Sequence, residues 1–146
     1  MKISKYGLEF IKREEGFIPK AYWDYKQYSI GYGSGKYENG NSVKEGDVVT
    51  EEKATAMLES WINKVVDISI KKYVLVPLPQ NRYDSLCSFI YNVGNSAFET
   101  STLLKLLNQN KILEAAAEFD RWIYAGGKTL DSLVKRRRRE KELFLK

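Results

Sequence analysis

The hydrophobic pattern of the chain changes at Thr50, and this change constrains the fold more than any other feature of the sequence. After Thr50, apolar residues recur at spacings of three and four, which places them on one face of a helix. These residues are Ala54, Met57, Leu58, Trp61, Ile62, Val65 and Val66. The Thr50 hydroxyl can accept a hydrogen bond from the first helical turn. The pattern therefore predicts one long helix over residues 51–70.

Further helical segments lie on both sides of this long helix. After a break near Pro77, the apolar spacing predicts helices at about 80–92, 101–109, 112–124 and 132–145. At the N-terminus, residues 3–15 are predicted to form a short helix with Ser4 as its cap. Gly16 can end that helix because glycine is the common residue just past a helix C-terminus.

The segment before Thr50 has a different character. Residues 20–50 combine closely spaced aromatic residues and glycines, which favours short strands and tight turns in a β-hairpin or meander. The segment 38–41 contains Asn39-Gly40, a pair that tolerates the backbone angles of a hairpin turn. The aromatic side chains can form the core of a small sheet, line a sugar-binding cleft, or do both.

Together these patterns predict a mostly helical α+β protein with two lobes. A small β lobe spans about 16–50, the long helix over 51–70 links it to the rest, and a helical lobe covers about 71–146 together with the N-terminal helix. A chain of 146 residues is long enough to bury a substantial core and suits a single domain.

The sequence contains no histidine and only one cysteine, Cys87. Catalytic relays through histidine, histidine-ligated metal sites and intrachain disulfides are therefore excluded. Cys87 lies within an apolar helical pattern, so we expect a buried core thiol rather than a nucleophile. No metal or other cofactor is expected. Carboxylates, with perturbed lysine or tyrosine, remain as the groups for acid–base chemistry.

The chain is basic, with 24 Lys and Arg against 19 Asp and Glu and a net charge of +5 at pH 7. Such a surface favours an anionic partner. The densest cationic run is Lys135–Arg139. It can be a nucleic-acid patch, the solvated face of a final helix, or a source of one arginine that turns inward to pair with a functional carboxylate. We favour the solvated face, and we expect no nucleic acid as partner.

No segment of the sequence reads as a membrane span or a secretion signal. The continuous apolar runs are far shorter than the ~20 residues needed to cross a bilayer, so we expect no stable membrane insertion. The N-terminal residues 1–16 lack the apolar centre of a signal peptide. We therefore expect the protein to accumulate in the cytoplasm of the cell that makes it, as a monomer, until something else releases it.

Cleavage of a glycosidic bond is one reaction that carboxylates can perform without histidine. One carboxylic acid protonates the leaving oxygen, and a second carboxylate directs water or attacks from the other face. Glu15, at the end of the first predicted helix, and Asp24, at the start of the aromatic segment, could face each other across a cleft between the lobes. Spacing alone does not select this pair among 19 acidic residues, and the helical pattern does not choose between Glu14 and Glu15.

A longer motif around these two residues resembles the active-site signature of the phage-type lysozymes, which are endolysins with muramidase activity. That family shows E-G, then A-Y-x-D, then T-I-G-x-G-H. The matching residues here are Glu15-Gly16, Ala21-Tyr22-Trp23-Asp24 and Ser29-Ile30-Gly31-Tyr32-Gly33. Later blocks resemble the helical lobe of the same family, so the resemblance covers nearly the whole chain in order. These blocks are 80–86, 89–94, 101–104, 116–122 and 136–140. The chain is most similar to short endolysins of tailed phages of enteric bacteria.

The resemblance implies a two-lobed lysozyme fold and three catalytic residues. Glu15 matches the general acid, Asp24 the carboxylate that positions the attacking water, and Ser29 the threonine whose hydroxyl helps to hold that water. The implied reaction is the endo-hydrolysis of the β-1,4 bond between N-acetylmuramic acid and N-acetylglucosamine in peptidoglycan. The family is usually described as inverting. The partner implied is the peptidoglycan glycan strand, and the outcome is bacterial lysis.

The sequence departs from the family pattern at three points. Ser29 keeps the hydroxyl but lacks the methyl group that stiffens threonine, so we expect reduced activity. The segment between Asp24 and Ser29 is about a residue shorter than usual. Ser34 stands where the family commonly has histidine, a residue whose role looks structural.

The resemblance also points to residues that touch glycan in relatives. Tyr91 and Thr102 match such positions, and Tyr32 lies within the signature, although packing accounts for each of them equally well. Two other functions stay open at this stage. The protein can be a non-catalytic peptidoglycan-binding module on the same scaffold, or a nucleic-acid binder that uses the arginine run.

Overall fold

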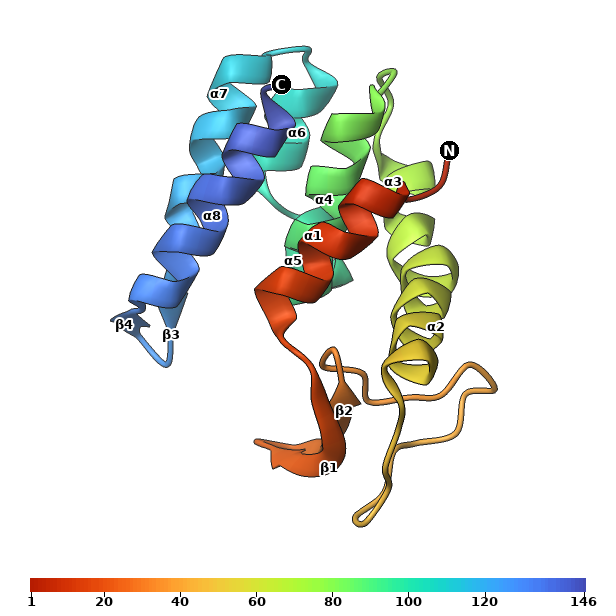
Figure 1. Ribbon diagram of the computed structural model, residues 1–146. Helices are drawn as coiled ribbons and strands as arrows, with labels where there is room; N and C mark the ends of the chain where they lie inside the picture. Colours follow the sequence, from red (N-terminus) through yellow and green to blue (C-terminus); the bar gives the residue numbers. More distant parts are fainter.

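The computed structural model describes all 146 residues, and the two lobes stand out in the arrangement of its elements (Figure 1). The hairpin of β1 (Ile18–Asp24) and β2 (Gln27–Gly31) lies at one end of the molecule, and α2 (Glu51–Trp61) leads from it toward the other helices. The prediction of a mostly helical α+β fold is confirmed. None of the helices combines the length and the apolar character that crossing a bilayer requires.

The first helix, α1 (Lys5–Glu15), ends where the sequence predicts and begins two residues later than predicted, directly after the predicted cap Ser4. The Ser4 Oγ accepts the backbone N–H of Gly7 at 3.0 Å, which satisfies one free donor of the first turn. The helix ends at Gly16, whose φ of 74° lies in a region that glycine enters at little cost. This turn directs the chain from the end of α1 into β1, so the residue before it lies at the junction of the two lobes.

The long helix predicted over 51–70 is three helical segments in succession. α2 is followed by a π-helical turn over Ile62–Val66 and then by α3 (Asp67–Tyr73). The Thr50 Oγ1 caps α2 by accepting the backbone N–H of Lys53 at 3.1 Å. In the π turn, the side-chain amide of Asn95 donates to the Val65 carbonyl at 2.9 Å. This partner comes from 30 residues away, and such a contact is not visible in the local apolar spacing.

The remaining helices follow the predicted pattern closely, with two exceptions. α4 (Gln80–Val93), α6 (Thr102–Asn108) and α8 (Asp131–Phe144) lie within three residues of their predicted limits. The helix predicted over 112–124 is shorter. It divides into α7 (Ile112–Ala117), a 3₁₀ turn (Glu118–Arg121) and the start of a small hairpin, β3 (Tyr124–Ala125) with β4 (Lys128–Thr129). A short helix, α5 (Asn95–Glu99), was not predicted.

The small lobe contains a β-hairpin and not the longer meander that was the other predicted arrangement. β1 pairs with β2 in antiparallel register, with Tyr22 opposite Ser29 and Asp24 opposite Gln27. The rest of residues 32–50 forms turns that are tied down by isolated bridges. The predicted turn at 38–41 is present, because Asn39 Oδ1 accepts the backbone N–H of Asn41 at 2.9 Å. Short loops with few ladder bonds therefore build most of this lobe.

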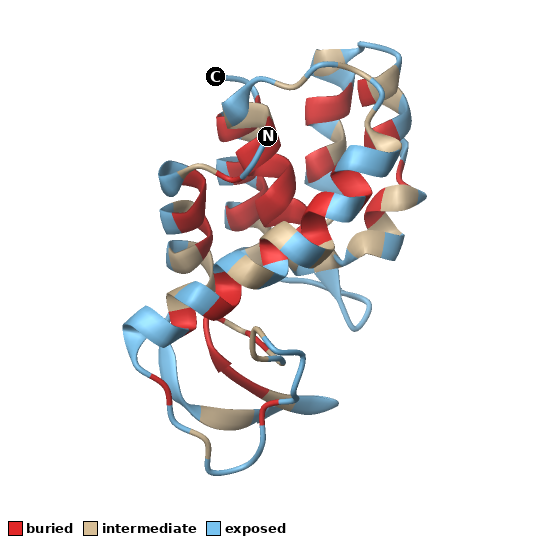
Figure 2. Cartoon of the chain, turned by 90° about the vertical axis from the view of Figure 1, so that its right-hand side faces the viewer, coloured by how far each residue is buried: buried red, intermediate tan, exposed pale blue.

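One continuous apolar core joins the lobes, and Figure 2 shows its buried segments concentrated among the helices. α4 runs through its centre, where Phe89 meets Phe119 edge to face at a ring separation of 5.2 Å. Ile30 and Val49 of the small lobe belong to the same core. Cys87 is fully buried on α4, as predicted, and burial raises the pKa of its thiol. The core thus fixes the small lobe against the helices.

Candidate active site

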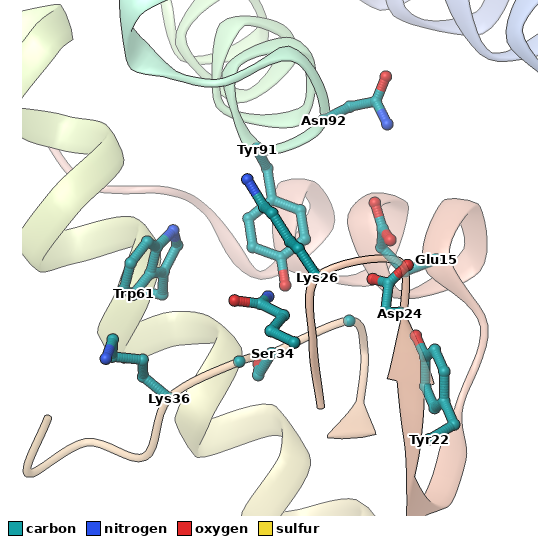
Figure 3. A pocket seen from close by; sticks show the side chains of 12 residues that line it. Glu15, Tyr22, Asp24, Lys26, Ser34, Lys36, Trp61, Tyr91 and Asn92 are labelled. Atoms are coloured by element: carbon teal, nitrogen blue, oxygen red, sulfur yellow. The ribbon is translucent and has the colours of Figure 1, made fainter. Parts of the chain in front are cut away.

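A cavity of about 420 Å³ opens between α1, the β1–β2 hairpin, α2 and α4 (Figure 3). Twelve residues line it. They are Glu15, Tyr22, Asp24, Lys26, Gln27, Gly33, Ser34, Gly35, Lys36, Trp61, Tyr91 and Asn92. Most of these side chains are polar, and both predicted catalytic carboxylates are among them. The cavity can therefore accept a polar polymer and offer it two acidic groups.

Glu15 is the last residue of α1, and its side chain is 19% exposed. The Nη1 of Arg136, on α8, donates to Glu15 Oε2 at 2.6 Å. The neighbouring Glu14 instead pairs with Arg139 outside the cavity, with Nε and Oε2 2.5 Å apart. Geometry therefore distinguishes two glutamates that the helical pattern left equivalent.

Gly33 leaves room for the Glu15 carboxylate. A Cβ atom at position 33 would lie 3.1 Å from Glu15 Oε1, closer than side chains ordinarily approach. The φ of Gly33 is 85°, which other residues rarely adopt. Two physical reasons thus favour glycine at position 33: the positive φ of the backbone, and the space that the Glu15 carboxylate occupies.

Asp24 and Ser29 meet because the hairpin brings their strands together. Asp24 is the exposed last residue of β1, and Ser29 is fully buried on β2. The Ser29 Oγ donates to Asp24 Oδ2 at 3.2 Å. Asp24 lines the cavity directly, whereas Ser29 lies behind it and reaches the cavity through this hydrogen bond.

Two tyrosines contribute protonated hydroxyl groups to the cavity. The Tyr91 hydroxyl donates to the Tyr32 carbonyl at 2.8 Å, and burial raises the pKa of Tyr91. The pKa of Tyr22 is also raised, first by burial and then by the charges of Asp24 and Glu15. Both hydroxyls are therefore hydrogen-bond donors at neutral pH.

Two residues predicted to contact glycan lie elsewhere. Tyr32 is buried, and its hydroxyl donates to Glu51 Oε2 at 2.8 Å; only its carbonyl reaches toward the site, through Tyr91. Thr102 is an exposed residue at the start of α6 and is not among the residues that line the cavity. Contact of either residue with substrate stays a prediction.

The cavity also contains residues that sequence reasoning did not select. Trp61, at the end of α2, is 37% exposed and stands on the opposite side of the opening from Asp24 and Glu15 (Figure 3). Lys26 and Lys36 also line the opening, together with Asn92. Trp61 falls on the apolar spacing of its helix, so it was indistinguishable from a core residue in the pattern. Lys26 and Lys36 lie outside the matching motifs, and Asn92 lies within the block 89–94 but was not selected as a site residue.

The preferred interpretation of the arginine run as a solvated face is wrong for two of its residues. Arg136 and Arg137 are 6% and 1% exposed. Burial of a guanidinium is costly unless an anion pairs with it, and Glu15 and Glu140 supply the anions here. Burial lowers the pKa of Arg136, but Glu140 and Glu15 outweigh that effect and leave it raised. The alternative of an inward-turning arginine is confirmed.

The comparisons with known proteins agree with this geometry. A family model described as phage lysozyme matches residues 12–140. The endolysin of Salmonella phage P22 is 46% identical over 146 residues, which cover 99% of each chain. The crystal structure of a mutant of P22 lysozyme matches with a TM-score of 0.89 at 44% identity, over 100% of this chain and 99% of that one. The muramidase domain of SpmX from Asticaccaulis excentricus matches with a TM-score of 0.89 at 37% identity, over 99% of this chain and 98% of that domain. The chain therefore belongs to the phage lysozyme family.

Proposed function

We propose that this protein is a muramidase that hydrolyses the β-1,4 bond between N-acetylmuramic acid and N-acetylglucosamine in peptidoglycan glycan strands and so lyses bacteria. The observation that carries the proposal is that Glu15 and Asp24, from two different elements, line the same cavity. A glycosidase needs two carboxyl groups with access to one bond, and it needs no histidine. The family membership supports the same activity.

In the proposed reaction, Glu15 gives its proton to the glycosidic oxygen. Asp24 takes a proton from the attacking water as the water oxygen bonds to the anomeric carbon and the glycosidic bond breaks, and its charge stabilises the positive charge that develops on the sugar ring. Ser29 holds Asp24 through its hydroxyl, which is 3.2 Å from Oδ2, and can turn to the water when one binds. We propose inversion at the anomeric carbon, because the path of this water leads to the face opposite the leaving group.

The remaining walls of the cavity suit a saccharide. The indole of Trp61 offers an apolar surface for a sugar ring, and Tyr22 offers a hydroxyl donor. The Tyr91 hydroxyl donates its proton to the Tyr32 carbonyl, so it can accept a hydrogen bond from a sugar hydroxyl. Lys26 and Lys36 place two cations beside the opening. Peptidoglycan carries carboxylates on its peptide stems, so these cations favour the wall polymer over a neutral glycan.

We further propose that one chain is sufficient for activity, as a single domain with its active site between the small lobe and the helices. Both carboxylates and the arginine that contacts Glu15 lie within the same domain. In this proposal the protein is made in the bacterial cytoplasm and reaches the wall only after release. No nucleic acid takes part.

The proposal is tested by Glu15→Gln with Glu14→Gln as its matched control. Glu15→Gln cannot donate the proton and should lower the rate of wall clearing by at least ~10²-fold. Glu14→Gln removes the same charge one residue away, outside the cavity, and should keep activity near that of the parent. Equal clearing by Glu15→Gln and the parent contradicts the assignment.

Product analysis tests the bond that is cut. Digested wall should acquire muramic acid at its new reducing ends. New glucosamine ends, or free peptides without new reducing ends, would refute a muramidase. Proton NMR of the first-formed anomer reports inversion directly. An inactive protein that still sediments with peptidoglycan would favour the binding-module alternative.

A further inference from the structure

Behind the cavity, a single buried carboxylate joins two buried arginines. Glu140, on α8, is 0% exposed. Its Oε2 accepts hydrogen bonds from Arg136 Nε at 3.1 Å and from Ser88 Oγ at 2.5 Å. Its Oε1 accepts a hydrogen bond from Arg137 Nη1. One side chain thus has all its contacts within the protein and none with solvent.

Each arginine in turn reaches a residue that lines the active cavity. Arg136 Nη1 donates to Glu15 Oε2 at 2.6 Å, and Arg137 Nη2 donates to the Asn92 Oδ1. The other donors contact backbone carbonyls: Arg136 Nη2 meets Ser88 O at 3.1 Å, and Arg137 Nε meets Trp122 O at 2.8 Å. Glu140 is therefore connected to each of the two cavity residues by one guanidinium, which forms a hydrogen bond with Glu140 on one side and with the cavity residue on the other.

The helix itself fixes the geometry of this cluster. Arg136 and Arg137 precede Glu140 by four and three residues, the spacings at which side chains meet on one face of a helix. The planar guanidinium groups offer donors in fixed directions, so a carboxylate bound at one edge orients the other edge. Glu140 consequently orients both arginines before substrate arrives.

The charges in the cluster also matter for the proton on Glu15. Arginine stays protonated in proteins, so Arg136 and Arg137 bring two positive charges into the interior. Glu140 balances one of them. If Glu140 were neutral, the charge of Arg136 would act undiminished on Glu15 and favour its ionised form, which cannot act as an acid.

We propose that Glu140 is a positioning residue for the hydrolysis: through Arg136 and Arg137 it orients Glu15 and Asn92, and it keeps Arg136 from drawing the proton off Glu15. This inference rests on the proposed function of Glu15 as the general acid. Glu140 touches no substrate, and it acts only through the two arginines.

The decisive experiment compares Glu140→Gln with Glu142→Gln. Both remove one negative charge from α8, but Glu142 is exposed and lies outside the cluster. Two quantities are measured for each folded variant: the pH–rate profile of wall hydrolysis, and the titration of the Glu15 carboxyl carbon by ¹³C NMR. The other titratable groups that face Glu15 are unchanged in both variants. They are Tyr22 and Asp24 of β1, Tyr91 of α4 and Arg136 of α8.

In Glu140→Gln, the alkaline limb of the pH–rate profile should move to lower pH, and the midpoint of the Glu15 titration should move with it. The rate at neutral pH should fall about tenfold, because misplacement of a catalytic group by a fraction of an ångström is expensive. Glu142→Gln should change neither quantity. Glu140→Asp retains the negative charge, so the alkaline limb of its pH–rate profile should lie close to that of the parent.

An unchanged limb and an unchanged Glu15 titration in folded Glu140→Gln would overturn the proposal. If that variant does not fold, Ser88→Ala provides the second test, because it removes one donor to Glu140 while keeping all charges. It should lower the rate without moving the limb, and full activity would count against the positioning role. A shifted Glu15 titration with an unshifted rate profile supports the role of Glu140 but refutes Glu15 as the acid, so the two proposals fail separately.

Discussion

Asp24 and Ser29 are five positions apart in the sequence and meet through the pairing of β1 with β2. The motif selected these two residues as candidates, and the pairing of the two strands explains how residues five positions apart come into contact. In spite of the short connecting segment, Ser29 Oγ reaches Asp24 Oδ2 at 3.2 Å, and its contact with the attacking water stays a prediction. A serine in this buried position has its rotamer limited by its surroundings and its partner.

At this scale we predict that Asp24→Asn separates chemistry from stability. Asparagine has nearly the same shape but no negative charge, so kcat should fall by ~10²-fold or more. The exposed position makes the change in unfolding free energy small, less than about 0.5 kcal/mol. Steady-state rates measure the change in kcat, and urea denaturation measures the change in unfolding free energy. Glu59→Gln, an exposed charge change on α2, is the control. A loss of activity that only follows a loss of stability would contradict the role.

The sequence was sufficient for some residues and insufficient for others. Asp24 and Gly33 belong to the motif, and both line the cavity, although only Asp24 was selected as a site residue. Trp61 shares its spacing with core residues, and only the exposure of its side chain in the cavity sets it apart. Arg136 was an alternative within a run of similar residues. Its selection depends on which face of α8 packs on α4, and a single sequence does not give that information.

At the scale of elements, Glu51, in the first turn of α2, ties α2 to α1. Its carboxylate accepts hydrogen bonds from Thr55 and from Tyr32 and pairs with Lys12 of α1 at 3.2 Å. These partners, Thr55 first, lower the pKa of Glu51 to about 2. The predicted helix start at Thr50 was correct, but the tie to α1 was not visible in the pattern.

We predict that this tie weakens in acid. A carboxyl group whose pKa is lower in the folded state stabilises the fold above its unfolded value, and the contribution is lost as pH falls. The contribution of Glu51 should therefore be complete near neutral pH and disappear between about pH 4.5 and 2. Glu51→Gln should be less stable than the parent at pH 7, and the difference should shrink toward pH 2. Urea denaturation at several pH values measures it.

The control for this prediction is Glu52→Gln, which removes the neighbouring charge but none of those hydrogen bonds. Its stability difference from the parent should be small and nearly constant over the same pH range. A gap between the parent and Glu51→Gln that stays constant down to pH 2 would count against the ionised carboxylate as the stabilising group.

Elements were predicted well where periodicity is strong and poorly where tertiary contacts decide. The helices around α4 and α8 were found within three residues. In the π turn of the linking helix, the Val65 carbonyl accepts a hydrogen bond from Asn95, and the hairpin after α7 turns at Gly126 and Gly127, which have positive φ. These features are short, and their partners are distant in sequence.

At the scale of the whole molecule, the pairing of Arg136 and Arg137 with Glu15 and Glu140 removes equal numbers of positive and negative charges, so the remaining residues still carry the net charge of +5. Arg136 and Arg137 are buried against carboxylates, so part of the cationic run does not face solvent. Lys26 and Lys36 at the cavity remain available to an anionic polymer. Composition predicted the sign of the partner's charge, and the structure locates two cations beside the active site.

We predict that wall hydrolysis weakens with salt through association rather than chemistry. Exposed charges are screened over about 10 Å at ~0.1 M salt, so raising the concentration further should lower kcat/KM and leave kcat nearly unchanged. Rates on purified peptidoglycan at several salt concentrations provide the measurement. Circular dichroism at each concentration confirms that the protein stays folded. A kcat that falls in parallel with kcat/KM would contradict this explanation.

The pairing of Glu15 with Arg136 joins residues 121 positions apart, and Arg136 lies on the last helix. During synthesis on a ribosome, Glu15 emerges before Arg136 and remains without this partner until α8 has been translated. A nascent chain interrupted before α8 has both of the carboxylates proposed to be catalytic, but it lacks the arginine that contacts Glu15. The order of translation thus delays the assembly of a wall-degrading enzyme inside the cell that produces it.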